Sequence, residues 1–407
     1  MTEASVAASE PARRRFVAPA ILTGILQTVA YGTFYYAFAV LKQPMAESGI
    51  DTRVLLIGLS AAFLIGGLCA PRVGRAIDAF DGRKVMALGT FAGGLACAAF
   101  SVSDRPVFLC IACGLLGVAF AASLYDAAFS TMVRVAPRDG RNSIIIITLI
   151  AGFASTLFWP ITHWLESRYG WRSTWQLYAL VNCCIATPAY AFLLPAPRKL
   201  PTHASDTEEQ PLSMESASGR RAFVLLAVLF SGAALVGATL SIHVIDILRR
   251  AGLDDGAAVG AASLIGAAQV AGRLVQFLLT RQISMMATAV FVVTCFPLSL
   301  LILAGTGSFR AALLFAAVYG LANGLLTIVR GALPLQFFGS RGYGHLMGRL
   351  AVPSLIAESV APAVSGIVFV ALGDTISILL LLGLAATSFT ATLLLFLERS
   401  KPVAEMP

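Results

Sequence analysis

Apolar segments long enough to cross a membrane recur along the whole chain of 407 residues. A helix needs about 20 apolar residues to cross the hydrocarbon core of a bilayer. The sequence offers twelve such segments in two groups of six: 17–40, 54–73, 85–102, 106–133, 143–162 and 173–195, then 222–247, 257–279, 286–305, 311–335, 350–372 and 375–397. We therefore expect an all-α polytopic membrane protein with twelve transmembrane helices.

The composition excludes most other classes of protein. Only 12% of the residues are charged, about half the share of a soluble globular protein, and the mean hydropathy is +0.83. The net charge of +8 is assigned to loops at a membrane surface, so no nucleic-acid partner is expected. The sequence has no phosphate-binding loop, no metal-ligand spacing and no nucleophile beside a base, so we expect no enzyme activity, no catalytic residue, no metal and no cofactor.

The division into domains follows from one internal polar stretch. It begins Pro-Ala-Pro-Arg-Lys and continues through Asp206 and Glu209, a composition that buries too little apolar area to fold alone. The predicted organisation is a tail at 1–16, a six-helix bundle at 17–195, a linker at 196–221, a second bundle at 222–397 and a tail at 398–407.

Basic residues concentrate in alternate loops, and this sets the orientation. With the N-terminus in the cytoplasm, most Lys and Arg residues fall on the cytoplasmic side, including Arg13–Arg15 and Arg220–Arg221. Both termini, the linker and both tails are then cytoplasmic. Arginine far outnumbers lysine, which favours a bacterial source. The protein is therefore predicted to lie in a bacterial inner membrane as a multi-pass protein.

The loop between the second and third segments carries a motif that we call the signature loop, residues 74–84. Its sequence is Gly-Arg-Ala-Ile-Asp-Ala-Phe-Asp-Gly-Arg-Lys, and it resembles the signature of the major facilitator superfamily at Gly74, Asp78, Gly82, Arg83 and Lys84. Ala79 replaces the usual basic residue. The resemblance implies two pseudo-symmetric six-helix bundles, in which the Gly permits close helix approach and the Asp interacts with the positive N-terminus of a neighbouring helix.

Two further runs carry a narrower resemblance. Residues 31–38, Tyr-Gly-Thr-Phe-Tyr-Tyr-Ala-Phe, and residues 268–273, Ala-Gln-Val-Ala-Gly-Arg, look like those of bacterial relatives of the monocarboxylate and oxalate/formate transporters. In that group an arginine of the eighth helix is implicated in binding a substrate carboxylate, and Arg273 stands at the matching position. Gln269 replaces the acidic residue of the animal monocarboxylate transporters, whose acidic-Gly-aromatic signature in the first helix is also missing.

Four charged residues lie inside predicted spans, namely Asp126, Arg273, Arg330 and Glu358. Each costs several kcal/mol at the bilayer centre unless it is paired or hydrated, so each is a functional candidate. A planar guanidinium at Arg273, with the amide of Gln269 one helical turn earlier, suits a bidentate grip on a carboxylate. The alternative is that Arg273 pairs with Asp126 or Glu358 and only stiffens the bundle.

The other charges suggest gating and proton coupling. Asp126 and Arg330 fall at corresponding positions of the two halves, so they would form a gate across the cavity, or each would have its own partner within its half. Arg330 is also a candidate second anion contact. Glu358 would carry a proton or balance one of the arginines permanently.

Tyrosines complete the predicted substrate contacts. Tyr31 and Tyr35 are one turn apart in the first segment, and Tyr125 precedes Asp126. Of these rings we select Tyr35 and Tyr125 as cavity-lining hydrogen-bond donors.

We expect a secondary active transporter that moves a small organic anion, with a monocarboxylate as the favoured class, by alternating access. Its expected partners are this anion, membrane lipids and, if transport is proton-coupled, protons. Two rivals stay open: an exporter of hydrophobic drugs or metabolites, and a membrane receptor of the same fold that has lost transport.

Overall fold

The computed structural model describes residues 10–103, 105–196, 212–279, 282–305 and 307–399. In this part of the chain every regular element is a helix. The chain divides into two compact units: unit 1 comprises residues 1–210 and 340–352, and unit 2 comprises residues 211–339 and 353–407. Each unit is described below by itself.

The helices of unit 1 include several short or π-helical pieces. They are α2 (Glu10–Ala30), η1 (Tyr31–Tyr36), α3 (Ala37–Glu47), α4 (Thr52–Ala79), α5 (Gly82–Ser101), α6 (Pro106–Ser123), α7 (Tyr125–Val135), η2 (Pro137–Asp139), α8 (Gly140–Ala151), α9 (Ala154–Val181), η3 (Asn182–Ala186) and η4 (Ala189–Leu193). Unit 1 also contains the first residues of α14, up to Val352.

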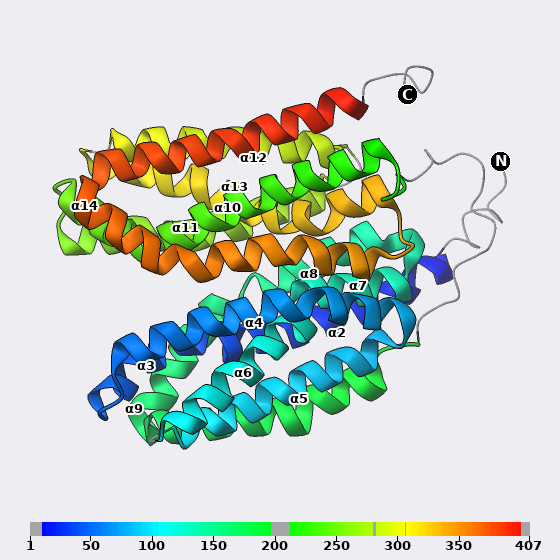
Figure 1. Cartoon of the computed structure of the whole chain (residues 1–407), viewed down its shortest axis with the longest axis horizontal. Coiled ribbons are helices and arrows are strands. Elements are labelled where there is room, and N and C mark those ends of the chain that lie inside the picture. The colour runs from blue at the N-terminus through cyan, green and yellow to red at the C-terminus, as the bar shows by residue number, and fades with distance from the viewer. Residues whose placement is uncertain (1–9, 104, 197–211, 280–281, 306, 400–407) are drawn as a thin grey trace. The chain divides into compact units, whose positions relative to one another are not determined.

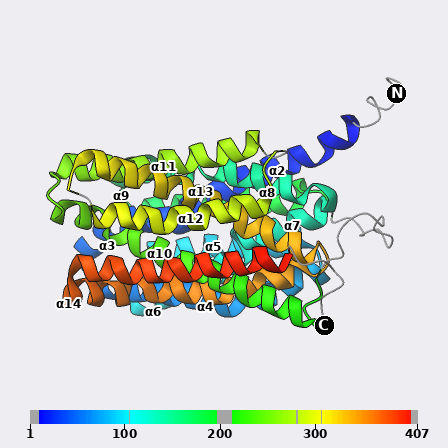
Figure 2. The ribbon, with the colours of Figure 1, turned by 90° about the horizontal axis from the view of Figure 1, so that it is seen from above.

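The helices of unit 2 are fewer and longer. They are α10 (Ala217–Arg250), α11 (Asp255–Leu278), α12 (Met285–Ala304), α13 (Phe309–Phe338) and the greater part of α14 (Tyr343–Arg399). Figure 2 shows α11, α13 and α12 running beside one another, and these three are continuous over their whole lengths.

The predicted all-α membrane fold is confirmed. Among the described residues, 10 helices are long and apolar enough to cross a membrane. Two helical stretches each contain two predicted segments, namely Pro137–Leu193 and α14. The chain reverses direction within each stretch at a glycine of positive φ, at Gly170 (79°) in the first and at Gly373 (75°) in the second. Only glycine adopts such a φ without strain. In Figure 1 the two arms of α14, drawn orange and red, fold back on each other at this turn.

The helix starts follow side-chain caps in the sequence. Ser216 precedes α10, and its hydroxyl accepts a hydrogen bond from the Gly219 amide at 2.9 Å. Such a cap satisfies one of the unpaired donors of a first helical turn. As a result α10 begins at Ala217, and Arg220 and Arg221 lie on the helix, whereas the sequence placed them in the linker.

Four predicted spans of unit 1 are interrupted, and in the sixth the interruption is a pair of π-helical stretches, η3 and η4. In the first span, η1 makes an i to i+5 hydrogen bond from the Ala37 amide to the Gly32 carbonyl. In the fourth span, Leu124 is extended, with ψ at −168°, between α6 and α7. In the fifth, α8 ends at Ala151 and α9 begins at Ala154. Interrupted membrane helices are tolerated where neighbouring groups satisfy the freed backbone, and they often mark functional sites.

Candidate functional site

Arg273 is buried in unit 2, with 5% of its surface exposed. Its Nε donates to the Gly324 carbonyl and to Thr327 Oγ1 of α13, both at 3.3 Å. Its Nη1 is buried and has no hydrogen-bond partner in the part of the chain that the structure describes. A guanidinium carries five donors, so Arg273 retains donors that can bind another group.

Close packing of α11 against α13 brings Arg273 to these acceptors. A Cβ at Gly324 would lie only 2.7 Å from the Gln269 Cα, and one at Gly320 would lie 2.8 Å from the Ala268 Cβ. Small residues of this kind allow helix backbones to approach closely inside a membrane. The sequence analysis missed Thr327, which lies one turn from Gly324 and donates to its carbonyl at 2.8 Å.

No carboxylate of unit 2 forms an ion pair with Arg273 among the described residues. Glu358 lies half-buried on α14 in unit 2, and the predicted alternative that Arg273 pairs with Asp126 or Glu358 stays a prediction. A buried cation without a countercharge is unfavourable in a medium of low dielectric constant. Anion binding by Arg273 stays a prediction.

Gln269 and Arg330 lie on the same two helices as this site. Gln269 is half-buried on α11, one turn before Arg273, and its side chain makes no hydrogen bond to any residue within the described ranges. Arg330 is half-buried on α13, three residues after Thr327 and hence on a neighbouring part of the same helix face. Adjoining helices of unit 2 therefore carry both intramembrane arginines.

The predicted tyrosines share one group of rings in unit 1, which we call the ring cluster: Tyr31, Tyr35, Tyr36, Tyr125 and Trp159. Tyr31 contacts Tyr125 with ring centroids 4.5 Å apart and Tyr35 with centroids 6.4 Å apart. Tyr36 extends the cluster to Trp159 at 5.8 Å. Tyr35 is 37% exposed and Trp159 is 50% exposed, so the cluster is not sealed in the core of unit 1.

Three members of this cluster, Tyr31, Tyr36 and Trp159, were not selected from the sequence. Tyr31 joins Tyr35 to Tyr125, and the spacing of four residues between Tyr31 and Tyr35 was the signal that could have selected it. Trp159 carried no comparable signal. Gly32, next to Tyr31 in the chain, packs so closely against the ring of Phe158 that a Cβ there would collide with it.

Asp126 lies in the first turn of α7, directly after the interruption at Leu124. The N-terminus of a helix carries a partial positive charge, which interacts favourably with acidic side chains. Asp126 belongs to unit 1 and Arg330 to unit 2, and the predicted gate between them stays a prediction.

The Asp78 carboxylate of the signature loop binds the start of α14. Its two oxygens accept hydrogen bonds from the Gly344 amide at 3.0 Å and the His345 amide at 2.6 Å. Gly74 faces the Gly344 carbonyl so closely that a Cβ would collide with it. All of these residues belong to unit 1. A carboxylate thus satisfies two amides that have no partner within their own helix.

Arg83 of the signature loop has a structural partner that the sequence analysis did not identify. Its Nε donates to both oxygens of Asp81 at 2.9 and 3.0 Å, and its Nη1 donates to the Leu194 carbonyl at 3.1 Å. The hydrogen bond from Arg83 holds the pKa of the Asp81 carboxyl below its usual value. Gly82 packs against Thr131, and Lys84 is exposed.

The fold and these sites together define a class of protein. Membrane-spanning helices in two units, with a charged residue buried between apolar helices, are typical of a polytopic membrane transporter. The chain belongs to the Major Facilitator Superfamily, whose sequence model matches residues 23–307. It is accordingly a transporter with transmembrane helices that binds a small-molecule substrate.

Solved structures share the fold over nearly the whole chain. One is the crystal structure of the human organic anion transporter MFSD10 (TETRAN), with a TM-score of 0.75, 16% identity and coverage of 93% of this chain and 99% of that one. Another is FucP, a Major Facilitator Superfamily transporter in the outward conformation, with a TM-score of 0.70, 14% identity and coverage of 95% and 100%. No curated protein matches the chain in sequence.

Proposed function

We propose that this transporter moves a small organic anion, most simply a monocarboxylate, across a bacterial inner membrane by alternating access. The observation that carries the proposal is the Arg273 side chain, which is buried and holds an Nη1 without a partner within the described part of the chain. A guanidinium binds a carboxylate through two parallel charge-assisted hydrogen bonds. A carboxylate cargo would supply both the countercharge and the missing acceptors.

The other predicted residues have supporting roles in this proposal. Gln269 and Arg330, on the two helices that position Arg273, would contact the same anion. Tyr35 and Tyr125 of the ring cluster would offer hydroxyl donors to it. Asp126 and Glu358 would serve gating or proton coupling.

The signature loop would stabilise one access state. Asp78 holds the first amides of α14, and this hydrogen bonding would be lost if α14 moved away from α4. Gly74 would keep the two backbones close in that state.

The likeness to the human organic anion transporter does not choose the substrate. At 16% identity it shows the fold alone. Support for an anionic cargo comes from Arg273 itself, and the assignment to a monocarboxylate rests on the resemblance of residues 268–273 described above.

The test is a flux assay in proteoliposomes with a panel of labelled carboxylates, with and without a pH gradient. Arg273→Gln should lower the flux of the carried acid about a hundred-fold, because it removes one partner of a desolvated charge pair. Arg310→Gln is the matched control, since Arg310 is exposed at the start of α13. Unchanged flux of every carried acid in the Arg273 variant would contradict the proposal.

The same vesicles separate the two rivals. An exporter of hydrophobic compounds would carry lipophilic cations, and its flux would not depend on Arg273. A receptor of this fold would show no flux of any tested compound, while the purified protein would still bind its ligand.

A further inference from the structure

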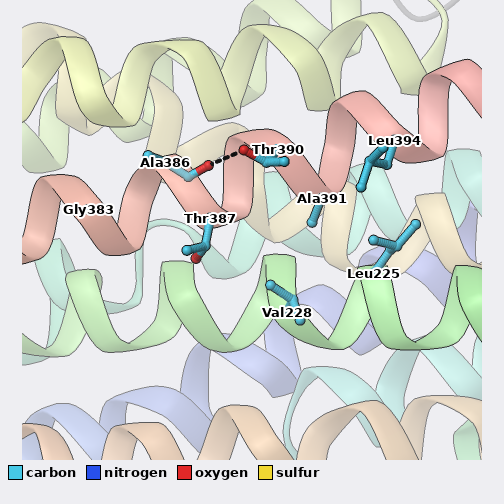
Figure 3. A pocket seen from close by; sticks show the side chains of 8 residues that line it. All are labelled: Leu225, Val228, Gly383, Ala386, Thr387, Thr390, Ala391 and Leu394. Atoms are coloured by element: carbon cyan, nitrogen blue, oxygen red, sulfur yellow. Dashed lines mark hydrogen bonds between the residues drawn. The ribbon is translucent and has the colours of Figure 1, made fainter.

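The second arm of α14 and the first turns of α10 leave an apolar groove on unit 2, with a volume of about 360 Å³. Figure 3 shows side chains from both helices at this groove. Its residues include Leu225 and Val228 of α10 and Gly383, Thr387, Ala391 and Leu394 of α14. The groove is therefore open at the surface of the unit and formed by small and branched residues.

The hydroxyl donors that line the groove are already used within their own helix. Thr387 Oγ1 donates to the Leu384 carbonyl at 2.7 Å, and Thr390 Oγ1 donates to the Ala386 carbonyl at 2.9 Å, a bond drawn in Figure 3. Both hydroxyls are thus satisfied within their own helix. A Cβ at Gly383 would meet nothing within 4 Å. These walls suit a flexible hydrocarbon chain.

Positive charge lies at one end of the groove. Arg221 precedes Leu225 by four residues and Val228 by seven, a spacing that places all three on one face of α10. Arg220 is exposed beside it and binds the Glu215 carbonyl through Nη1 at 2.7 Å. The N-terminus of α10 at Ala217 adds the positive end of a helix dipole.

We propose that this groove binds one anionic phospholipid of the surrounding bilayer, with an acyl chain along Leu225 and Gly383 and the phosphate at Arg220 and Arg221. Basic residues at the membrane surface attract anionic headgroups, and the predicted cytoplasmic side is where such lipids are recognised. A second copy of the chain is disfavoured as occupant. An isologous dimer about the membrane normal would bring two copies of Arg221 to the same depth, where they repel.

The test is native mass spectrometry of the full-length protein with added phosphatidylglycerol or phosphatidylcholine of identical acyl chains. The wild type should retain phosphatidylglycerol in preference, by about five-fold for each arginine. Arg220→Gln with Arg221→Gln should abolish this preference. Gly383→Leu should lower the retention of both lipids, because its side chain would fill the groove.

Two controls match these variants. Arg310→Gln removes an exposed arginine elsewhere, and Gly114→Leu adds a side chain at another open helical glycine of the described chain. Neither should change lipid retention. If the double arginine variant fails to fold, Gly383→Leu still tests the groove.

Four results would overturn the proposal. The first is equal retention of both lipids by the wild type, and the second is unchanged lipid retention in the Gly383→Leu variant. Glycerol phosphate without acyl chains would displace the lipid completely, which indicates a simple anion site. A dimer that Gly383→Leu dissociates, with lipid retention unaffected, would assign the groove to a second copy.

Discussion

The two units treat polar groups inside apolar helices in different ways. In unit 1, amide side chains join separate spans: Gln27 Nε2 donates to the Ser123 carbonyl at 2.6 Å and to Tyr190 at 3.1 Å, and Asn182 Nδ2 donates to Thr33 at 2.9 Å. Unit 2 has one such amide bond, from Thr288 Oγ1 to Gln276 Oε1 at 3.0 Å, but its uninterrupted helices α11 and α13 also press together through glycines and hold a guanidinium whose Nη1 has no partner in the described residues.

This difference is consistent with separate roles for the two halves of the chain. Neutral hydrogen bonds between spans stabilise interrupted helices at a modest energy each. A buried cation does not stabilise a helix pair unless it is compensated, and the proposed anionic substrate would supply that compensation at Arg273. In the proposed function, unit 1 would thus contribute the aromatic rings and Asp126, and unit 2 would contribute the arginine that binds the anion.

The largest effect should come from filling the close contacts of each unit. Gly32→Val in unit 1 and Gly324→Val in unit 2 should each lower the free energy of unfolding by about 3 kcal/mol, because the packing leaves no room for a side chain. The measurement is thermal unfolding of the purified protein in detergent, with Gly114→Ala as the control at an open glycine.

A second substitution should restore stability to the Gly32→Val variant of unit 1 but not to the Gly324→Val variant of unit 2. Gly32 faces the Phe158 ring, so adding Phe158→Ala should restore part of the stability. Gly324 faces the backbone of Gln269, so Gln269→Ala should not rescue Gly324→Val. Equal rescue in both units would show that the close contacts are alike in kind.

The next largest effect concerns the carboxylate that unit 1 uses as an acceptor. Asp78→Asn should weaken its bonds to the Gly344 and His345 amides by about 2 kcal/mol, since hydrogen bonds to a charged group exceed those to a neutral one. Hydrogen exchange at these two amides should rise at least about ten-fold. Asp81→Asn, the control, should leave them protected.

A smaller effect should follow from changing the acceptor that orients the guanidinium of unit 2. Thr327→Val removes the Oγ1 that accepts from Arg273 Nε, which should raise the KM for the transported acid about three- to five-fold at nearly constant maximal rate. Thr327→Ser retains the hydroxyl and should behave as the wild type. An unchanged KM in the valine variant would remove Thr327 from the site.

The smallest effect should come from an exposed ion pair. Asp246 and Arg249 are 3.4 Å apart and about half exposed, so Asp246→Asn should change the free energy of unfolding by less than about 0.5 kcal/mol. Asp374, which binds Arg250 through both oxygens at 2.6 and 2.8 Å, is the comparison. Thermal unfolding of Asp374→Asn should show the larger shift of the two.

The sequence was sufficient for the helical segments and for the burial of Arg273, because long apolar runs and the charges inside them are local properties of composition. It could not predict where the spans are interrupted, since no residue type around Leu124 or Tyr31 signals a departure from the α-helix. It also could not find the partner of Asp78, which lies 266 positions away at Gly344. Thr327 escaped notice because a threonine in an apolar helix usually bonds its own backbone.

The π-helical turn at Tyr31–Tyr36 has a consequence for engineering the first span. A wider turn accommodates one residue more than an α-helix would over the same rise. Residues before Ala30 and after Ala37 are therefore rotated out of the common register that a helical wheel would assign to them. Deleting a single residue here should restore regular winding while turning the two ends of the span against each other.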